Sequence, residues 1–107
     1  MRHVLFVCGK NRRRSPTAEA IFSGIDGIEV SSSGTATDAY CPVSADLIEW
    51  ANDIVVMEER QARQLRKRLV GELRNNRLVS LNIADRYALM QPELIEELRA
   101  KASRWIK

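Results

Sequence analysis

Apolar residues come in short runs at four places along the chain, and such runs predict β-strands. In chain order, the expected strands are His3–Val7, Ile28–Ser32, Asp53–Met57 and Leu78–Ile83. The first and third runs are apolar almost throughout, which is typical of strands in a sheet that is covered on both faces.

Segments with helical spacing of apolar residues separate these runs. Ser15 and Pro16 open the first helix, because proline is tolerated in a first helical turn, and Gly24 and Gly27 end it. The other expected helices are Ser44–Trp50, Glu58–Leu73 and Pro92–Ile106. Strands and helices therefore alternate, which predicts an α/β fold: a three-layer α/β/α arrangement around a four-stranded parallel sheet.

In open parallel sheets, ligands bind beyond the carboxyl ends of the strands. Cys8 lies at the carboxyl end of the first expected strand, and Asp85 follows the fourth. These two residues are the first candidates for a functional site.

Length and composition argue against several classes of protein. The chain has 107 residues, which predicts a single domain over residues 1–107. Its net charge of +3 is too small by itself to indicate nucleic-acid binding, and no apolar stretch approaches the roughly 20 residues of a membrane span. The two cysteines, Cys8 and Cys41, are not spaced as metal ligands, so no metal or cofactor is expected. These features favour a cytoplasmic protein.

The segment that follows the first strand has the composition of an anion-binding loop. A loop of this length between a strand and a helix can turn its backbone N–H groups inward, and the helix N-terminus adds a partial positive charge. Gly9 and Asn11 tolerate the left-handed backbone conformations that such a nest requires. Arg14 would close the ring with a planar guanidinium that matches two phosphate oxygens. The residues between Cys8 and Arg14 are Gly9, Lys10, Asn11, Arg12 and Arg13.

The same positive field acts on the thiol of Cys8. Cations and a helix N-terminus favour the thiolate, which is the nucleophilic form of cysteine. Ser15, one turn away, can donate its hydroxyl hydrogen to the sulfur. The pattern thus predicts a bound phosphate that faces a nucleophilic Cys8, whereas the alternative is a small buried apolar cysteine at a strand end.

This segment resembles the active-site motif of the low-molecular-weight protein tyrosine phosphatases, as does, more weakly, most of the rest of the chain. The motif residues that match are Cys8, Asn11, Arg14, Ser15, Pro16, Ala18 and Glu19. The resemblance implies a short, divergent member of the family, in which the Cys8 thiolate attacks phosphorus and forms a phosphocysteine. It implies that Asp85 is the general acid and that Tyr87 walls the pocket. The alternatives are a turn or cap residue at Asp85 and another acid, Asp53, which we interpret as a turn residue.

On this basis the expected activity is hydrolysis of phosphate monoesters, with a phosphorylated protein or a small phosphate ester as substrate and inorganic phosphate as product. Arg86 stands where the family has a proline, and Lys10, Arg12 and Arg13 make the loop more basic than usual. We therefore expect a preference for acidic or multiply phosphorylated ligands. Tyr40 is a second candidate for the pocket wall, and a surface tyrosine is its alternative.

Three other functions are alternatives to hydrolysis. An arsenate reductase would need two further cysteines besides Cys8, and only Cys41 is present. A phosphocarrier domain would need neither Arg14 nor Asp85. A nucleic-acid-binding module is suggested by a basic stretch, but that stretch has no aromatic residues for base stacking, which argues against it. Its basic residues are Arg60, Arg63, Arg66, Lys67, Arg68, Arg74 and Arg77.

Overall fold

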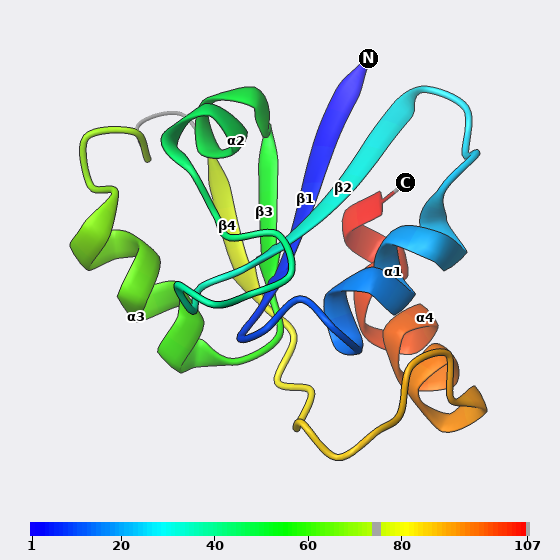
Figure 1. Ribbon diagram of the computed structural model, residues 1–107. Helices are drawn as coiled ribbons and strands as arrows, with labels where there is room; N and C mark the ends of the chain where they lie inside the picture. Colours follow the sequence, from blue (N-terminus) through cyan, green and yellow to red (C-terminus); the bar gives the residue numbers. More distant parts are fainter. Residues whose placement is uncertain (74–75, 107) are drawn as a thin grey trace.

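The computed structural model describes residues 1–73 and 76–106 of the chain, so Arg74 of the basic stretch lies outside the described residues. Strands and helices alternate along the whole of it (Figure 1). In chain order the elements are β1 Arg2–Cys8, α1 Arg14–Phe22, β2 Ile28–Gly34, α2 Ala45–Trp50, β3 Asp53–Val56, α3 Glu59–Arg68, β4 Arg77–Ser80 and α4 Pro92–Ile106.

The four strands form one parallel sheet in the order β2-β1-β3-β4. Strand β1 is central and pairs with β2 on one side, Cys8 opposite Gly34, and with β3 on the other, Val7 opposite Val56. The predicted four-stranded parallel sheet is therefore confirmed. After β1 the chain forms β2 on one side of it, and after β2 it crosses back to form β3 on the other side of β1. The strand order therefore reverses at the carboxyl end of β1. Ligand sites of doubly wound sheets lie at this position.

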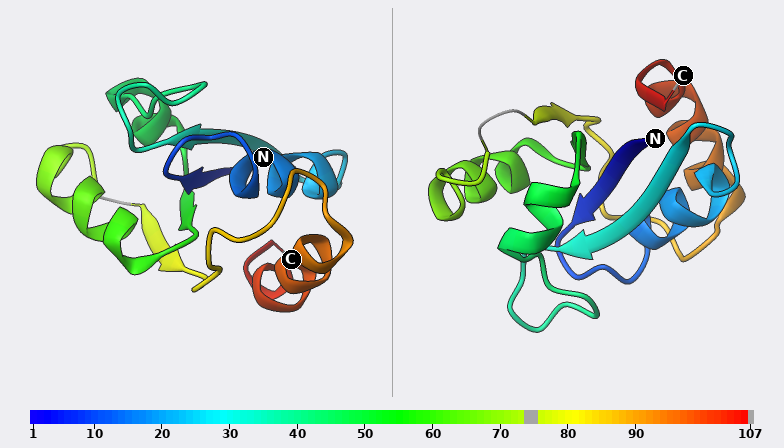
Figure 2. Two further views of the ribbon diagram at one scale, coloured as in Figure 1. Left: turned by 60° about the horizontal axis from the view of Figure 1, so that its bottom comes forward. Right: turned by 90° about the horizontal axis from the view of Figure 1, so that it is seen from above.

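Helices cover both faces of the sheet (Figure 2). Helices α1 and α4 pack on one face, where Phe6 and Phe22 stack at 5.6 Å between ring centroids. Helices α2 and α3 pack on the other face, where Ile48 and Leu65 are fully buried against Leu5 and Val7. The predicted three layers are thus present, and the side chains of β1 alternate between two separate cores.

Helix α3 is shorter than the sequence predicted. It begins at a capping box, in which Glu58 and Gln61 bond each other's backbone N–H groups, but it ends at Arg68 instead of Leu73. The apolar spacing continues past the helix because Leu69 and Leu73 still pack against the core from irregular backbone. The apolar spacing therefore predicted correctly which residues are buried, but the helix end that it predicted is wrong.

Strand β4 is also shorter than expected, since it ends at Ser80 and not at Ile83. The chain stays extended beyond it: the N–H of Leu81 donates to the carbonyl of Val56, and the N–H of Ile83 donates to the carbonyl of Met57. These two hydrogen bonds hold the segment before Asp85 against β3, so that Asp85 lies at the carboxyl edge of the sheet. None of the helices in the described residues is long and apolar enough to cross a membrane.

Candidate active site

Cys8 is the last residue of β1, and its side chain is almost fully buried. Two groups contact its Sγ atom: the hydroxyl of Ser15 at 2.9 Å and the backbone N–H of Asn11 at 3.2 Å. Both groups can donate a hydrogen bond to the sulfur, so two donors face the atom that the sequence predicts to be the nucleophile.

Asn11 sets the shape of the loop around this sulfur. Its φ of 56° places it in the left-handed region, which asparagine tolerates better than most residues. Its side-chain amide donates to the Ser15 hydroxyl at 2.9 Å. Because the Ser15 oxygen accepts this bond, its hydroxyl hydrogen points elsewhere. It can donate a hydrogen bond to the Cys8 sulfur or to the carbonyl of Ser33, 3.3 Å away.

The segment after β2 fastens the loop from outside. The carbonyls of Cys8, Gly9 and Lys10 accept hydrogen bonds of 2.9–3.0 Å from backbone N–H groups at Thr35, Ala36 and Tyr40, in that order. Gly34 lies so close that a Cβ atom there would stand 2.6 Å from the carbonyl oxygen of Gly9 and 2.9 Å from the backbone nitrogen of Asn11. Only glycine therefore allows β2 to approach the loop this closely.

Arg14, the first residue of α1, is buried although it carries a charge. Its Nη1 atom donates to Glu58 Oε1 and to the carbonyl of Ile83, both at 2.7 Å. Its Nε atom lies 3.8 Å from Asp85 Oδ1. One nitrogen is thus anchored to the protein, and the guanidinium is held in a fixed plane at the edge of the pocket.

Glu58 is the carboxylate that compensates this buried charge. Burial alone would raise its pKa, but the hydrogen bond and charge of Arg14, helped by Arg60, outweigh that effect and hold the pKa of Glu58 below its usual value. Glu58 therefore stays ionised near neutral pH. From the sequence, Glu58 is expected only at the start of a helix, because no local pattern indicates its contact with Arg14, a residue 44 positions away.

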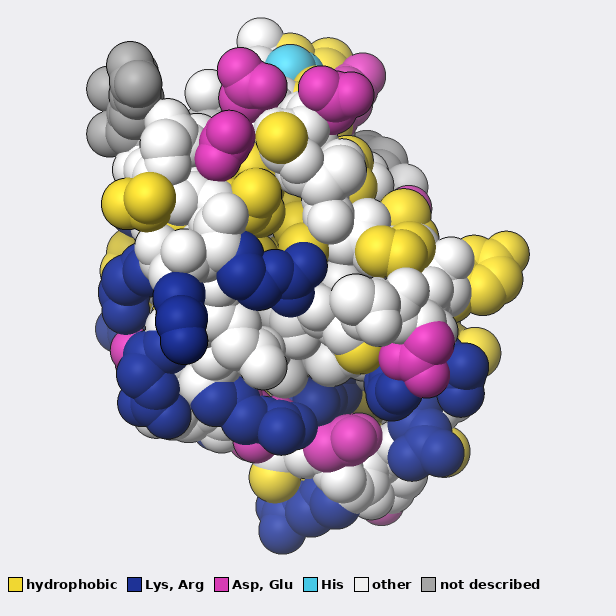
Figure 3. Space-filling model, turned by 60° about the vertical axis from the view of Figure 1, so that its left-hand side comes forward, with side chains coloured by type: hydrophobic (Ala, Val, Ile, Leu, Met, Phe, Trp, Pro, Cys, Tyr) yellow, Lys and Arg dark blue, Asp and Glu magenta, His cyan; other side chains and the backbone are white. Residues whose placement is uncertain are grey.

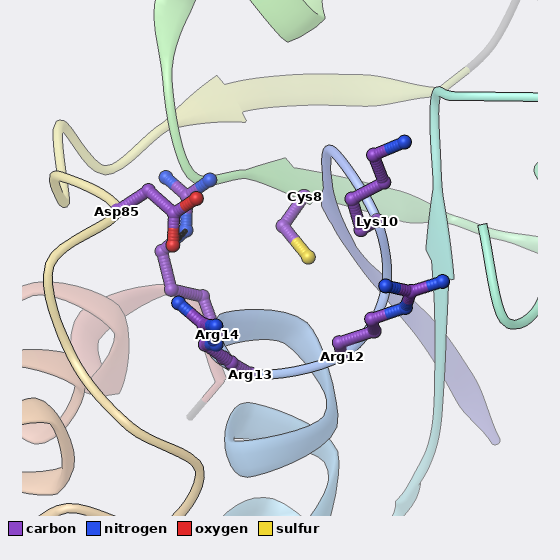
Figure 4. A pocket seen from close by; sticks show the side chains of 6 residues that line it. All are labelled: Cys8, Lys10, Arg12, Arg13, Arg14 and Asp85. Carbon is purple, nitrogen blue, oxygen red and sulfur yellow. Dashed lines mark ion pairs between the residues drawn. The ribbon is translucent and has the colours of Figure 1, made fainter. Parts of the chain in front are cut away.

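These groups enclose a pocket of about 130 Å³, lined by Cys8, Lys10, Arg12, Arg13, Arg14 and Asp85 (Figure 4). Sites that enclose a whole drug-sized ligand measure roughly 300–1,000 Å³. This pocket is large enough for a phosphoryl group and leaves the remainder of a substrate outside. The Asp85 side chain is 51% exposed and turns its carboxyl toward Cys8.

Other predicted site residues take different positions. Lys10 is paired with both oxygens of Asp38, at 2.6 and 2.7 Å, and its ammonium group points away from the sulfur. Tyr87 is buried, donates its O–H to Glu97 Oε1 at 2.6 Å, and lines a neighbouring hollow instead of this pocket. Tyr40 is 86% exposed and is not among the lining residues.

Asp53 lies in a different environment from the pocket. It is the first residue of β3, not a turn residue as the sequence suggested, and its carboxylate pairs with Arg2 and Arg77 at 2.7 and 2.9 Å. It faces Val4 of β1, near the amino end of the strand, whereas Cys8 is at the carboxyl end. The described residues contain no group of three acidic, histidine or cysteine side chains that could hold a metal ion.

The sequence matches one family model. The model of the low molecular weight phosphotyrosine protein phosphatases covers residues 3–73, which include the whole loop from Cys8 to Ser15 and also Glu58. The chain belongs to this family. As a member of it, the chain is a cysteine-based phosphatase. Asp85 and Tyr87 lie beyond the matched residues, and no curated protein matches the chain significantly.

Solved structures resemble this fold over almost its whole length. The YwlE arginine phosphatase from Geobacillus stearothermophilus is 19% identical with a TM-score of 0.77, over 98% of this chain and 93% of its own. The tyrosine phosphatase amsI from Erwinia amylovora is 17% identical with a TM-score of 0.78, over 98% and 91%. The low molecular weight protein tyrosine phosphatase SP-PTP from Streptococcus pyogenes is 15% identical with a TM-score of 0.74, over 99% and 91%. At these identities the likeness is one of fold.

Proposed function

We propose that this phosphatase hydrolyses phosphate monoesters, phosphotyrosine in proteins foremost, through a phosphocysteine formed on Cys8. The observation that carries the proposal is that Cys8 and Arg14, from the segment that joins β1 to α1, line one small pocket together with Asp85, from the segment after β4. We propose further that residues 1–107 act as one phosphatase domain, in the cytoplasm, where a nucleophilic thiol stays reduced.

Substrate binding comes first. The phosphoryl group enters the pocket, where Arg14 and the inward backbone N–H groups of the loop from Gly9 to Ser15 bind its oxygens. The protein holds Arg14 in place beforehand through Glu58 and the carbonyl of Ile83. This arrangement aligns phosphorus with the Cys8 sulfur, and preorganised charge of this kind stabilises the transition state without reorganisation.

The thiolate of Cys8 then attacks phosphorus. A sulfur–phosphorus bond forms, the bond from phosphorus to the ester oxygen breaks, and Asp85 gives its proton to the leaving oxygen. The products of this step are the alcohol or phenol and a phosphocysteine. Asp85 suits this role because it lines the same pocket and is open to the leaving group.

Hydrolysis of the intermediate completes the cycle. Asp85, now ionised, removes a proton from water, the water oxygen bonds to phosphorus, and the sulfur leaves as a thiolate. Ser15, at 2.9 Å from Sγ, donates a hydrogen bond from its hydroxyl to the departing thiolate and keeps its proton. Inorganic phosphate is released and Asp85 is again protonated.

Hydrolysis of para-nitrophenyl phosphate between pH 5 and 8 tests these roles. We expect Cys8→Ser to abolish turnover and Asp85→Asn to reduce it by roughly 10²- to 10⁴-fold, the usual contribution of general acid–base catalysis. Cys41→Ser and Asp26→Asn make the same chemical changes outside the pocket, and both should leave the rate unchanged. Full activity in Cys8→Ser would contradict the proposal.

A further inference from the structure

A second hollow lies directly beside the active-site pocket. It has a volume of about 560 Å³ and is lined by Arg12, Arg13, Arg86, Tyr87, Ala88, Leu89 and Gln91. Arg12 and Arg13 line both spaces, so the two adjoin at these side chains. A substrate whose phosphoryl group fills the inner pocket can therefore place its neighbouring atoms in this hollow.

The hollow carries three cations that form no direct ion pair in the described residues, although the charges of Arg12 and Arg86 help to lower the pKa values of Asp38 and Glu97. Within the described part of the chain, no ion pair involves Arg12, Arg13 or Arg86. Lys and Arg side chains also gather toward this end of the molecule, which is where the strands have their carboxyl ends, whereas several acidic side chains lie at the opposite end (Figure 3).

The nearby carboxylates already have other partners. Asp38 is bound to Lys10, and Asp85 lies beside Arg14 in the inner pocket. Glu97 is bound to Lys101 at 2.7 Å and to the Tyr87 hydroxyl, and Glu93 accepts a hydrogen bond from Gln91. Asp38 and Glu97 thus act on Arg12 and Arg86 without a direct ion pair, and each of the three guanidinium groups can still bind an external anion.

Arg86 is oriented and not merely exposed. Its guanidinium lies 5.2 Å from the centroid of the Tyr87 ring, and its Nη2 donates to the Tyr87 hydroxyl at 3.1 Å. The segment that carries it is fastened to helix α1, because the N–H of Met90 donates to Thr17 Oγ1 at 3.0 Å. Next to this guanidinium, Leu89 is 54% exposed and provides an apolar surface.

From this juxtaposition we propose that Arg12, Arg13 and Arg86 form a subsite for a second anionic group of the substrate, a phosphate or carboxylate close to the phosphoryl group that is hydrolysed. The inference rests on the proposed phosphatase function of the inner pocket. The apolar surface of Leu89 beside the cations suits a polypeptide substrate, in which an acidic or phosphorylated residue lies near the phosphotyrosine. Planar guanidinium groups match the oxygens of either anion.

Matched substrates test the subsite. Phosphotyrosyl peptides with neutral, glutamate or phosphoserine neighbours would be compared by kcat/KM, together with phenyl phosphate with and without a second phosphate on the ring. We expect about a fivefold to tenfold preference for the doubly anionic peptides at low salt, declining as salt screens exposed charges. If the enzyme preferred the bisphosphate over phenyl phosphate but showed no preference among the peptides, the second anion would not come from a peptide. That result would overturn the assignment of a polypeptide substrate.

Substitution of Arg86 then localises the effect. Arg86→Gln should lower the ratio of acidic to neutral kcat/KM by about threefold, which is typical of one exposed ion pair. Arg63→Gln removes an exposed guanidinium from helix α3, outside both spaces, and should leave this ratio unchanged. Equal turnover of neutral and acidic peptides, in an enzyme that hydrolyses both, would overturn the subsite alone. If the wild type hydrolysed none of these substrates, the result would overturn the phosphatase mechanism instead.

Discussion

At the scale of single residues, the site depends on a buried charge that must be compensated. Arg14 is only 2% exposed, and the carboxylate that meets it comes from Glu58. Cys8, Asn11, Arg14 and Ser15 could be predicted from the sequence because they lie within eight consecutive positions whose types and spacing suit a phosphate. Glu58 could not, because its contact with Arg14 depends on how strands β1 and β3 pair.

Glu58→Gln should weaken phosphate binding and destabilise the fold. A neutral amide leaves the buried Arg14 without an ionised partner, and loss of a hydrogen bond to a charged group costs about 1–3 kcal/mol. We expect kcat/KM for para-nitrophenyl phosphate to fall about tenfold or more, together with a lower free energy of unfolding. Glu59→Gln, which neutralises the adjacent exposed carboxylate, is the matched control.

The pH dependence of stability distinguishes this ion pair from a general packing effect. The pKa of Glu58 is lowered in the folded state, so its contribution to stability is present above its unfolded pKa and is lost as pH falls through the folded value. The stability difference between wild type and Glu58→Gln should therefore be full at pH 6 and shrink below about pH 4.5. A difference that does not change with pH, measured by denaturant unfolding, would argue against the pair.

At the scale of elements, the carboxyl end of β2 supports the loop that holds the phosphate. Three backbone hydrogen bonds from the segment after Gly34 fix three carbonyls of the loop on its outer side, while the N–H of Asn11 faces the Cys8 sulfur on its inner side. The sequence predicted β2 and the loop separately, but their close approach depends on the register that sets Gly34 opposite Cys8. Helix ends were less predictable, since Leu69 and Leu73 keep helical spacing beyond the end of α3.

Gly34→Ala should therefore damage the site without touching a catalytic side chain. A methyl group there meets backbone atoms of Gly9 and Asn11 at 2.6 and 2.9 Å, and backbone cannot move aside cheaply. Overpacking of this kind costs about 1–3 kcal/mol, and we expect a loss of at least tenfold in kcat/KM. Gly71→Ala is the control, because nothing lies within 4 Å of a Cβ at that position. Normal activity in Gly34→Ala would show that the loop does not need this contact.

At the scale of the whole molecule, the sheet brings Cys8, Glu58 and Asp85 to one edge from three separate connections. Alternating strands and helices predicted the parallel sheet and its two covered faces, and the family model confirms the fold class. The strand order was not predicted, because the apolar pattern of a strand does not say which neighbours it pairs with. The pairing of Lys10 with Asp38 was not predicted for the same reason. Because Lys10 is paired, the cations without a direct ion pair at the two spaces, among the described residues, are Arg12, Arg13 and Arg86.

The proposed mechanism requires that Cys8 itself accept the phosphoryl group. The most direct test mixes the enzyme with radiolabelled phenyl phosphate, stops the reaction in denaturant within one turnover, and locates the label by peptide mapping. The mechanism predicts label on the peptide that contains Cys8, in wild type and in Cys41→Ser, and none in Cys8→Ser. Turnover without labelled Cys8, or label on another residue of an active enzyme, would contradict it.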